Sequence, residues 1–174
     1  AWRAVMTRGR LQPGETVLVT GASGGVSTPA ILIARRMGAH VFAVTSTAHV
    51  ERVRALGADV VYDRNEVDYS REIWKDTSKR GVDLIVDSVG AATWPQNIRA
   101  AAKLGRIVVY GGTTGPTLES DVRQLFWKQL SIIGTTMSSR PEFRDVMARV
   151  FARDFEPIVD AVLPLEEART AHER

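Results

Sequence analysis

VLVTGASGGVS, residues 17–27, is the stretch of sequence that decides the fold. An apolar run leads into small residues and glycines, and a helical pattern of apolar residues follows from Val26. Glycines between a strand and a helix let the backbone approach a pyrophosphate, whose charge lies against free N–H groups at the helix N-terminus. The match to the fingerprint G-x-G-x-x-G is incomplete, because Ala22, Gly24 and Ser27 occupy its three glycine positions. The stretch predicts a dinucleotide-binding loop, with a glycine turn that only packs strand against helix as the alternative.

The rest of the chain alternates short β-branched runs with segments whose apolar residues recur every three or four positions, a pattern typical of βαβ units. The predicted strands are 16–20, 41–45, 60–62, 83–87, 107–110 and 130–134, with a last short strand at 158–163. The predicted helices are 26–37, 50–56, 70–79, 94–104 and 122–129, with a leading helix near Trp2 and a closing one at 165–174. Continuous apolar runs suit strands that are buried on both faces. We therefore predict an α/β fold of Rossmann type, a doubly wound six-stranded parallel sheet with helices on both faces.

Pro13-Gly14 and Pro157 mark the predicted boundaries of this unit. Residues 1–14 are interpreted as an interdomain helix and linker, and residues 15–156 as the Rossmann domain. Residues 157–174 are interpreted as a return segment toward a catalytic domain that this chain does not contain. The chain begins at Ala1 rather than at a methionine, so we expect a piece of a longer protein.

Composition narrows the function classes. The 174 residues carry a net charge of +3, spread without a run of basic residues, so we expect no nucleic-acid partner. No apolar stretch approaches the roughly 20 residues of a membrane span, and we expect a cytoplasmic protein. The absence of cysteine excludes disulfides, thiolate nucleophiles and cysteine-ligated metals from this chain. The three histidines are isolated, so we predict no metal site in it.

Other nucleotide-binding families fit the sequence less well. A P-loop would require Lys followed by Ser or Thr after a second glycine, and no such pair is present. A short-chain dehydrogenase requires a tyrosine with a lysine four positions on, and those positions hold Glu66, Ile73 and Thr114. A methyltransferase would place an acid at the end of the second strand, where residues 43–47 read AVTST. Binding of S-adenosylmethionine without a response to dinucleotides is what this third reading would predict.

The missing acid also bears on cofactor choice. An acid about 20 residues after the glycine loop binds the ribose 2′-hydroxyl of NAD and would repel the 2′-phosphate of NADP. This chain offers hydroxyls and cations there, which favours NADP(H) over NAD(H). The candidate contacts are Ser46, Thr47, His49, Arg52 and Arg64. The alternative is that both arginines are ordinary solvated surface charges.

Five ordered runs carry a family resemblance: GETVLVTGASGGVS (14–27), RALGADVV (54–61), GVDLIVDSVG (81–90), GRIVVYGG (105–112) and FWKQLSIIGTTM (126–137). The chain resembles the cofactor-binding domain of the medium-chain dehydrogenase/reductase superfamily. It is most similar to the quinone-oxidoreductase-like and zinc-type alcohol-dehydrogenase-like members. The resemblance implies a family member reduced to about half its length.

The resemblance assigns cofactor contacts position by position. The turn over the pyrophosphate matches Ala22, Ser23, Gly24, Gly25 and Val26. Turns beside the nicotinamide half match Ser88, Val89, Gly90, Gly111, Gly112 and Thr113, and backbone groups for its carboxamide match Gly134, Thr135 and Thr136. These glycines have an alternative role as plain strand-to-helix turns.

Three positions depart from the family pattern or bear on it. Ser27 stands in place of the last motif glycine, and we expect looser packing of the first helix. Ser46 matches a position that contacts the adenosine ribose or its phosphate. His49 replaces a family lysine, and Arg64 stands where relatives often have a tyrosine beside the adenine.

The implied reaction is hydride transfer between the nicotinamide and a carbonyl or alcohol, a quinone or an activated alkene. We predict no catalytic residue and no metal ligand within this chain, with zinc possible only in the missing domain, so the chain alone should be inactive or nearly so. The resemblance also implies a homodimer through the strand at 130–134, which would cover an apolar sheet edge. The alternative function is a non-catalytic nucleotide-binding sensor or scaffold.

Overall fold

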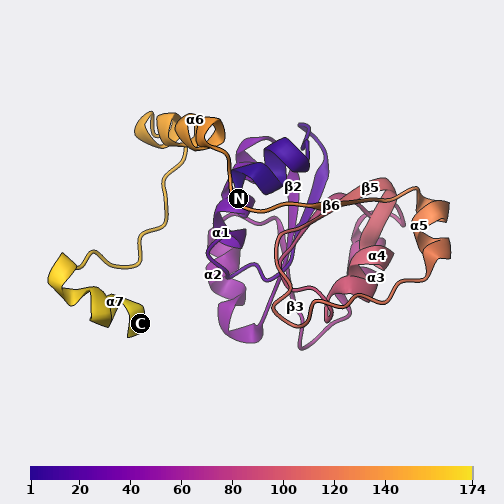
Figure 1. Ribbon diagram of the computed structural model, residues 1–174. Coiled ribbons are helices and arrows are strands. Elements are labelled where there is room, and N and C mark those ends of the chain that lie inside the picture. The colour runs from indigo at the N-terminus through magenta and orange to yellow at the C-terminus, as the bar shows by residue number, and fades with distance from the viewer. Residues whose placement is uncertain (174) are drawn as a thin grey trace.

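A single six-stranded parallel sheet organises the computed structural model, which describes residues 1–173 (Figure 1). Its strands are β1 (Thr16–Val19), β2 (His40–Thr45), β3 (Val60–Asp63), β4 (Val82–Asp87), β5 (Ala101–Val109) and β6 (Ser131–Gly134). They lie in the order β3-β2-β1-β4-β5-β6, and every neighbouring pair is parallel. This is the predicted doubly wound topology, with the reversal of strand order between β1 and β4.

The helices are η1 (Arg3–Arg8), α1 (Ser27–Arg36), η2 (Thr47–His49), α2 (Val50–Ala55), α3 (Tyr69–Asp76), α4 (Trp94–Ala100), α5 (Val122–Lys128), α6 (Arg140–Phe151), η3 (Leu165–Glu167) and α7 (Ala168–Glu173). The predicted leading helix is thus η1, a π-type helix, and the closing helix is η3 with α7. Position 174 of that prediction lies outside the described residues. None of the helices in residues 1–173 is both long and apolar enough to cross a membrane.

Successive side chains of β1 point to opposite faces of the sheet and enter two separate cores. Val17 and Val19 pack in one core with Ile31 of α1. Leu18 packs in the other with Ile73 of α3. The helices therefore cover both faces, as the continuous apolar strands predicted.

The predicted helix 94–104 is too long. The structure ends α4 at Ala100, and β5 begins at Ala101, where it pairs with Val82. Lys128 helps to end the helix there. Its Nζ donates to the carbonyls of Ile98, Arg99 and Ala101 at 2.9, 2.8 and 2.8 Å. These are carbonyls at the end of α4, where a cation is favourable.

The C-terminal part also differs from the prediction. Residues 158–163 form no strand, since no described strand lies beside them to accept their backbone hydrogen bonds. Helix α6 was not predicted, although it begins with a capping box. Ser139 Oγ accepts from the Glu142 backbone N–H, and the Glu142 carboxylate accepts from the Ser139 N–H. The pattern S-x-x-E was available in the sequence.

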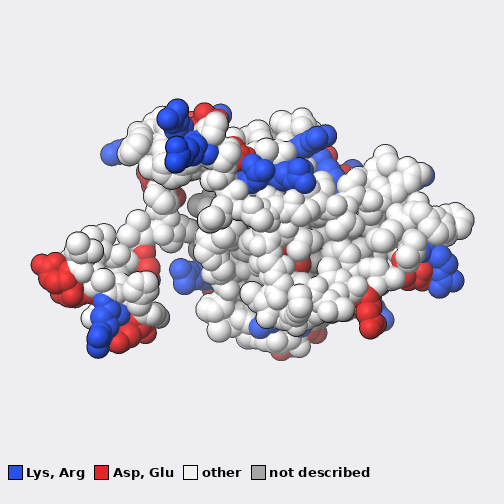
Figure 2. Space-filling view, in the orientation of Figure 1, with Lys and Arg blue, Asp and Glu red and all other residues white. Residues whose placement is uncertain are grey.

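Helix α6 is held by η1 from the start of the chain. Arg3 Nη1 and Thr7 Oγ1 donate to the Glu142 carboxylate at 2.6 and 2.5 Å. Farther along α6, the Arg149 guanidinium lies 4.9 Å from the ring centroid of Trp2. Charged side chains of both signs are scattered over the face seen in Figure 2, with large uncharged areas between them.

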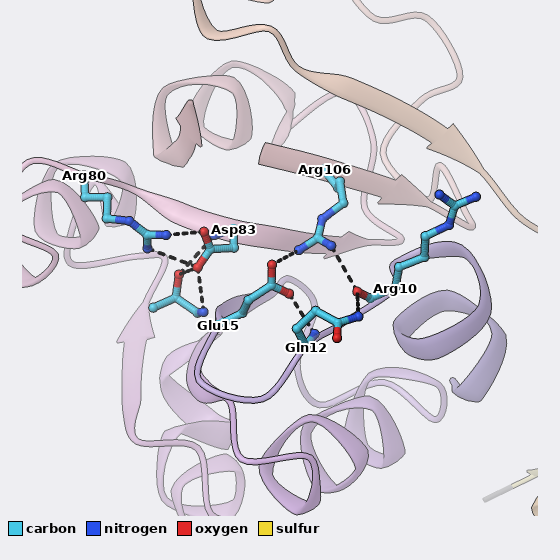
Figure 3. A network of polar contacts seen from close by, with 7 residues as sticks. Arg10, Gln12, Glu15, Arg80, Asp83 and Arg106 are labelled. Atoms are coloured by element: carbon cyan, nitrogen blue, oxygen red, sulfur yellow. Dashed lines mark hydrogen bonds and ion pairs between the residues drawn. The ribbon is translucent and has the colours of Figure 1, made fainter. Parts of the chain in front are cut away.

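The amino-terminal edge of the sheet is closed by a network of charged groups (Figure 3). Arg106 of β5 donates to the Glu15 carboxylate at 2.6 Å and to the Arg10 carbonyl at 3.1 Å. Asp83, in β4, pairs with the Arg80 guanidinium and accepts from the N–H and hydroxyl of Thr16 at 2.9 and 2.8 Å. The carboxyl-terminal edge, by contrast, carries the glycine loop.

Candidate functional site

The glycine loop, residues 20–27, turns sharply as it leaves β1. Gly21 has a φ of +56°, a conformation that side chains rarely adopt, and a Cβ there would lie 3.2 Å from Val89 Cγ2. The loop is anchored by bonds from the Ala22 N–H to the Val44 carbonyl and from the Gly24 N–H to the Gly21 carbonyl, at 3.0 and 2.9 Å. These bonds fix the backbone path ahead of α1.

The far side of the loop is open. No atom of the described residues lies within 4 Å of a Cβ built on Gly25, which stands two residues before α1 begins. Within residues 1–173, the N–H groups of Gly25 and Val26 have no hydrogen-bond acceptor. Free N–H groups and the positive end of a ten-residue helix together make a place for an anion. A pyrophosphate fits this arrangement.

Asp87 ties the loop to the neighbouring strand. Its side chain ends β4 and is fully buried. The carboxylate accepts from the Thr20 hydroxyl, from the Thr93 hydroxyl at 2.8 Å and from the Gly90 N–H at 3.0 Å. Three donors from two segments therefore satisfy one buried charge, which fixes the turn after β4 relative to the turn after β1.

The turns after β4 and β5, residues 88–90 and 111–113, pack on each other. The Thr113 and Thr114 N–H groups donate to the Ser88 and Val89 carbonyls at 3.2 and 2.9 Å. A Cβ on Gly111 would lie 2.9 Å from the Ser88 carbonyl oxygen. A close approach of two backbones thus accounts for Gly111, rather than the positive φ of a plain turn, which Gly90 has and Gly111 has not. Both turns lie at the ligand-binding edge.

The end of β6 is held in place from η1. The Arg8 Nε–H donates to the Gly134 carbonyl at 3.2 Å, and the Thr135 N–H donates to the Val109 carbonyl at 3.0 Å. The Thr135 hydroxyl is buried and has no protein partner within the described part of the chain. Such a buried hydroxyl is a candidate for a ligand contact, because leaving it unpaired costs free energy.

A cavity of about 940 Å³ joins several of these segments. Among the predicted contact residues, its lining includes Ser23, Gly25, Val26, Arg52, Thr135 and Thr136. The glycine loop and the end of β6 therefore open into one space. Apolar side chains line the remaining part, among them Trp2 just before η1, Leu32 of α1 and Phe143 of α6.

The other predicted contacts stand outside that lining. Ser46 follows β2, His49 ends η2 and Arg64 is exposed after β3. Thr47 already has protein partners, since the Asn65 side-chain amide donates to its hydroxyl at 3.0 Å. The Thr47 hydroxyl in turn bonds to the Asp63 carboxylate, which lowers the pKa of Asp63. The structure thus leaves Thr47 less available to a ligand than the sequence suggested.

Two residues that were not predicted as cofactor contacts lie in the candidate site. Tyr110 follows β5 and lines the cavity. Ser27 is 1% exposed, and its hydroxyl donates to the Thr20 carbonyl at 3.2 Å and lies 2.8 Å from the Tyr110 phenol oxygen. The expected loosening of α1 is not what the structure shows, because the serine is buried and bonded. Within residues 1–173, no group of three His, Asp or Glu side chains could hold a metal ion.

Comparisons with known proteins give the family and the fold of the chain. A family model described as zinc-binding dehydrogenase matches residues 25–152. Human quinone oxidoreductase is 32% identical over 180 residues, which cover 99% of this chain and 54% of that protein. A crystal structure described as an NAD-dependent alcohol dehydrogenase superposes with a TM-score of 0.88 at 35% identity, over 99% of this chain and 50% of that one.

A crotonyl-CoA carboxylase/reductase solved in complex with NADP gives a TM-score of 0.89 at 26% identity, over 99% of this chain and 49% of that one. The chain thus spans about half the length of the relatives that it matches.

Proposed function

The chain belongs to the zinc-binding dehydrogenase family, and on this premise we propose that it is the NADP(H)-binding domain of a medium-chain oxidoreductase. The observation that carries the proposal is the open side of the glycine loop. Two unpaired N–H groups, the space beside Gly25 and the N-terminus of α1 suit a pyrophosphate in charge and in size. Both the oxidoreductase class and a nicotinamide dinucleotide agree with the relatives.

Each segment of the carboxyl edge then has a role in binding. Residues 22–26 form the turn over the pyrophosphate, and within them the free N–H groups of Gly25 and Val26 bind it, while α1 adds its dipole. Residues 88–90 and 111–113 border the nicotinamide half, while residues 134–136 offer backbone groups and the unpaired Thr135 hydroxyl to its carboxamide. The bound cofactor supplies the hydride chemistry, and this domain supplies grip and orientation.

The preference for NADP(H) is supported by the end of β2. No acid follows β2 at residues 45–50, and Ser46, His49 and Arg52 offer donors to a 2′-phosphate. Arg64 lies after the neighbouring strand β3, whose Asp63 pairs with Thr45 of β2 in register. Relatives use either cofactor according to their descriptions, so the chain's own residues must decide.

The reaction proposed for the whole protein is hydride transfer between the nicotinamide and a carbonyl or alcohol, a quinone or an activated alkene. The substrate-binding and any zinc-binding residues are placed outside this chain, which supplies no catalytic acid or base. We expect no turnover by the pure chain with NADPH and quinone or enone substrates. Turnover that copurifies with the chain and disappears on mutation of Gly25 would contradict this.

A homodimer through β6 is part of the proposal. Strand β6 is one of the two edge strands of the sheet, and Ile132 in it is 44% exposed. Phe126 and Trp127 of the adjacent α5 are also exposed. An apolar sheet edge beside exposed aromatic rings suits pairing with a second copy. Sedimentation of the chain and of an Ile132→Lys variant would test this, with a monomeric variant and a dimeric parent as the expected result.

Titration with NADPH, NADH and S-adenosylmethionine, followed by tryptophan fluorescence, tests the central claim. We expect NADPH to bind at least about tenfold more tightly than NADH, a difference of about 1.4 kcal/mol. Equal affinities would remove the 2′-phosphate assignment from Ser46, His49 and Arg52. Binding of S-adenosylmethionine alone would favour the methyltransferase alternative, and tight dinucleotide binding by a full-length protein without turnover would favour the sensor.

A further inference from the structure

Ser27 and Tyr110 form a hydroxyl pair that joins two segments of the carboxyl edge. Ser27 begins α1, and Tyr110 follows β5, 83 positions later. Their oxygens are 2.8 Å apart. A glycine at position 27, as in the family motif, could not make this contact. The pair is therefore a feature of this chain's departure from the motif.

The protons of the pair can be assigned. A serine hydroxyl has one proton, and that of Ser27 is directed to the Thr20 carbonyl, which can only accept. Both hydrogen bonds of Ser27 are made together only when its Oγ accepts the proton of the Tyr110 phenol, because a Ser27 proton given to Tyr110 would leave the Thr20 carbonyl. The phenol oxygen of Tyr110 is left with acceptor capacity and no proton to give.

This assignment selects the kind of ligand group that Tyr110 can bind. A phosphate oxygen is an acceptor, so the phenol cannot bond to the pyrophosphate while it donates to Ser27. A ribose hydroxyl or a carboxamide N–H is a donor and suits it. Tyr110 lines the same cavity as Thr135 and Thr136 of the β6 end, and Arg52 and the glycine loop also line it. The strand order favours the nicotinamide half, because Tyr110 follows β5, the neighbour of β6, whereas β2 and β3 lie on the other side of β1.

We propose that Tyr110, oriented by Ser27, is a positioning residue that accepts a hydrogen bond from the nicotinamide half of the cofactor. The inference rests on the proposed function, because it presupposes a bound dinucleotide. It assigns Ser27 a role in place of the missing motif glycine. Restoring that glycine should weaken cofactor binding rather than improve it.

A double-mutant cycle with two ligands tests the pair. The variants are Tyr110→Phe, Ser27→Gly and both together, and the ligands are NADPH and adenosine 2′,5′-bisphosphate, which lacks the nicotinamide half. We expect Tyr110→Phe and Ser27→Gly each to weaken NADPH binding about five- to tenfold, the range of one hydrogen bond. The double variant should be no weaker than either single one. Binding of adenosine 2′,5′-bisphosphate should stay within about twofold throughout.

Two further variants keep the result interpretable. Ser27→Ala removes the hydroxyl without adding the flexibility of glycine at the start of α1, and it should reproduce Ser27→Gly. Tyr62→Phe is the matched control, since the Tyr62 phenol bonds to Asp76 at 2.6 Å, away from the cavity lining. It should leave both affinities unchanged.

The outcomes separate the two proposals. If the parent chain binds neither NADPH nor NADH, the proposed function fails and this inference fails with it. If the parent binds NADPH but the two substitutions act additively, or weaken both ligands equally, only the pair is refuted. An unchanged NADPH affinity in Tyr110→Phe has the same meaning.

Discussion

The two edges of the sheet are built on opposite principles. At the amino edge, Arg106 pairs with Glu15 and Arg80 pairs with Asp83, so each charged group has a partner (Figure 3). At the carboxyl edge, glycines, unpaired N–H groups and the unpaired Thr135 hydroxyl leave hydrogen-bonding capacity unused. Saturated polar groups stabilise the chain, whereas unsaturated ones cost stability and become useful when a ligand binds.

Asp87 is the exception at the carboxyl edge, and its removal should give the largest effect. Asp87→Ala leaves the Gly90 N–H buried without an acceptor. The Thr20 and Thr93 hydroxyls lose the carboxylate and keep only the carbonyls of Val86 and Gly90, at 3.4 and 3.1 Å. We expect a loss of about 3 kcal/mol in the free energy of unfolding, measured by urea denaturation. A loss below about 1 kcal/mol would mean that the two turns are held mainly by other contacts.

Gly25→Ala should separate binding from stability. The added Cβ meets no protein atom within 4 Å but enters the space assigned to the pyrophosphate. We expect NADPH binding to weaken about thirtyfold, or about 2 kcal/mol, with an unchanged free energy of unfolding. Equal affinity in parent and variant would show that the phosphates bind elsewhere.

Glu15→Gln should weaken the amino edge alone. The Glu15 carboxylate accepts from Arg106 at 2.6 Å and from the Gln12 N–H at 2.8 Å, and the charged pair is partly buried. We expect a loss of about 1 kcal/mol in the free energy of unfolding, without a change in NADPH affinity. An altered affinity would show that the two edges communicate, contrary to the comparison.

The smallest expected effect is the contribution of Asp83 to stability at low pH. Burial works to raise the pKa of Asp83, but the Arg80 guanidinium and the Thr16 N–H and hydroxyl outweigh it and hold the pKa below its ordinary value of 3.8. The stability that this shift contributes is present above pH 3.8 and is lost as the pH falls through the lower, folded-state value.

Asp83→Asn should therefore cost stability at neutral pH and flatten the loss of stability below pH 3.8. We expect a contribution of about 0.5 kcal/mol, read from urea denaturation at several pH values. A parallel pH profile in parent and variant would contradict the shift.

The central strands could be predicted from the sequence because they are buried on both faces. Residues 17–19 and 84–86 are apolar without interruption, and that pattern leaves few alternatives. The end of α4 could not be predicted in the same way. It depends on Lys128, which lies 28 positions beyond Ala100 and reaches back to the helix carbonyls. Helix α6 could have been predicted from Ser139 and Glu142.

In the candidate site too, local features could be predicted from the sequence, whereas contacts between distant positions could not. The glycine loop is local, so spacing alone indicated it. The Ser27–Tyr110 contact joins positions 83 apart and depends on the sheet order, so Ser27 looked like a defect in the motif. The hydrogen bonds of Thr47 to Asn65 and Asp63 likewise could not be predicted from the sequence. Cofactor preference, the β6 dimer and the activity of the whole protein stay predictions.

The place of the site between β1 and β4 has a consequence for how the protein comes into being. These central neighbours are 67 positions apart at Val17 and Leu84, so their pairing closes a long loop, a slow and entropically costly step. Strands β1 to β3 can pair earlier, but without β4 the buried Asp87 has not reached Thr20. The candidate cofactor site is therefore incomplete on a partly folded chain. We therefore expect a dinucleotide to stabilise the folded chain against proteolysis without speeding the early steps of folding.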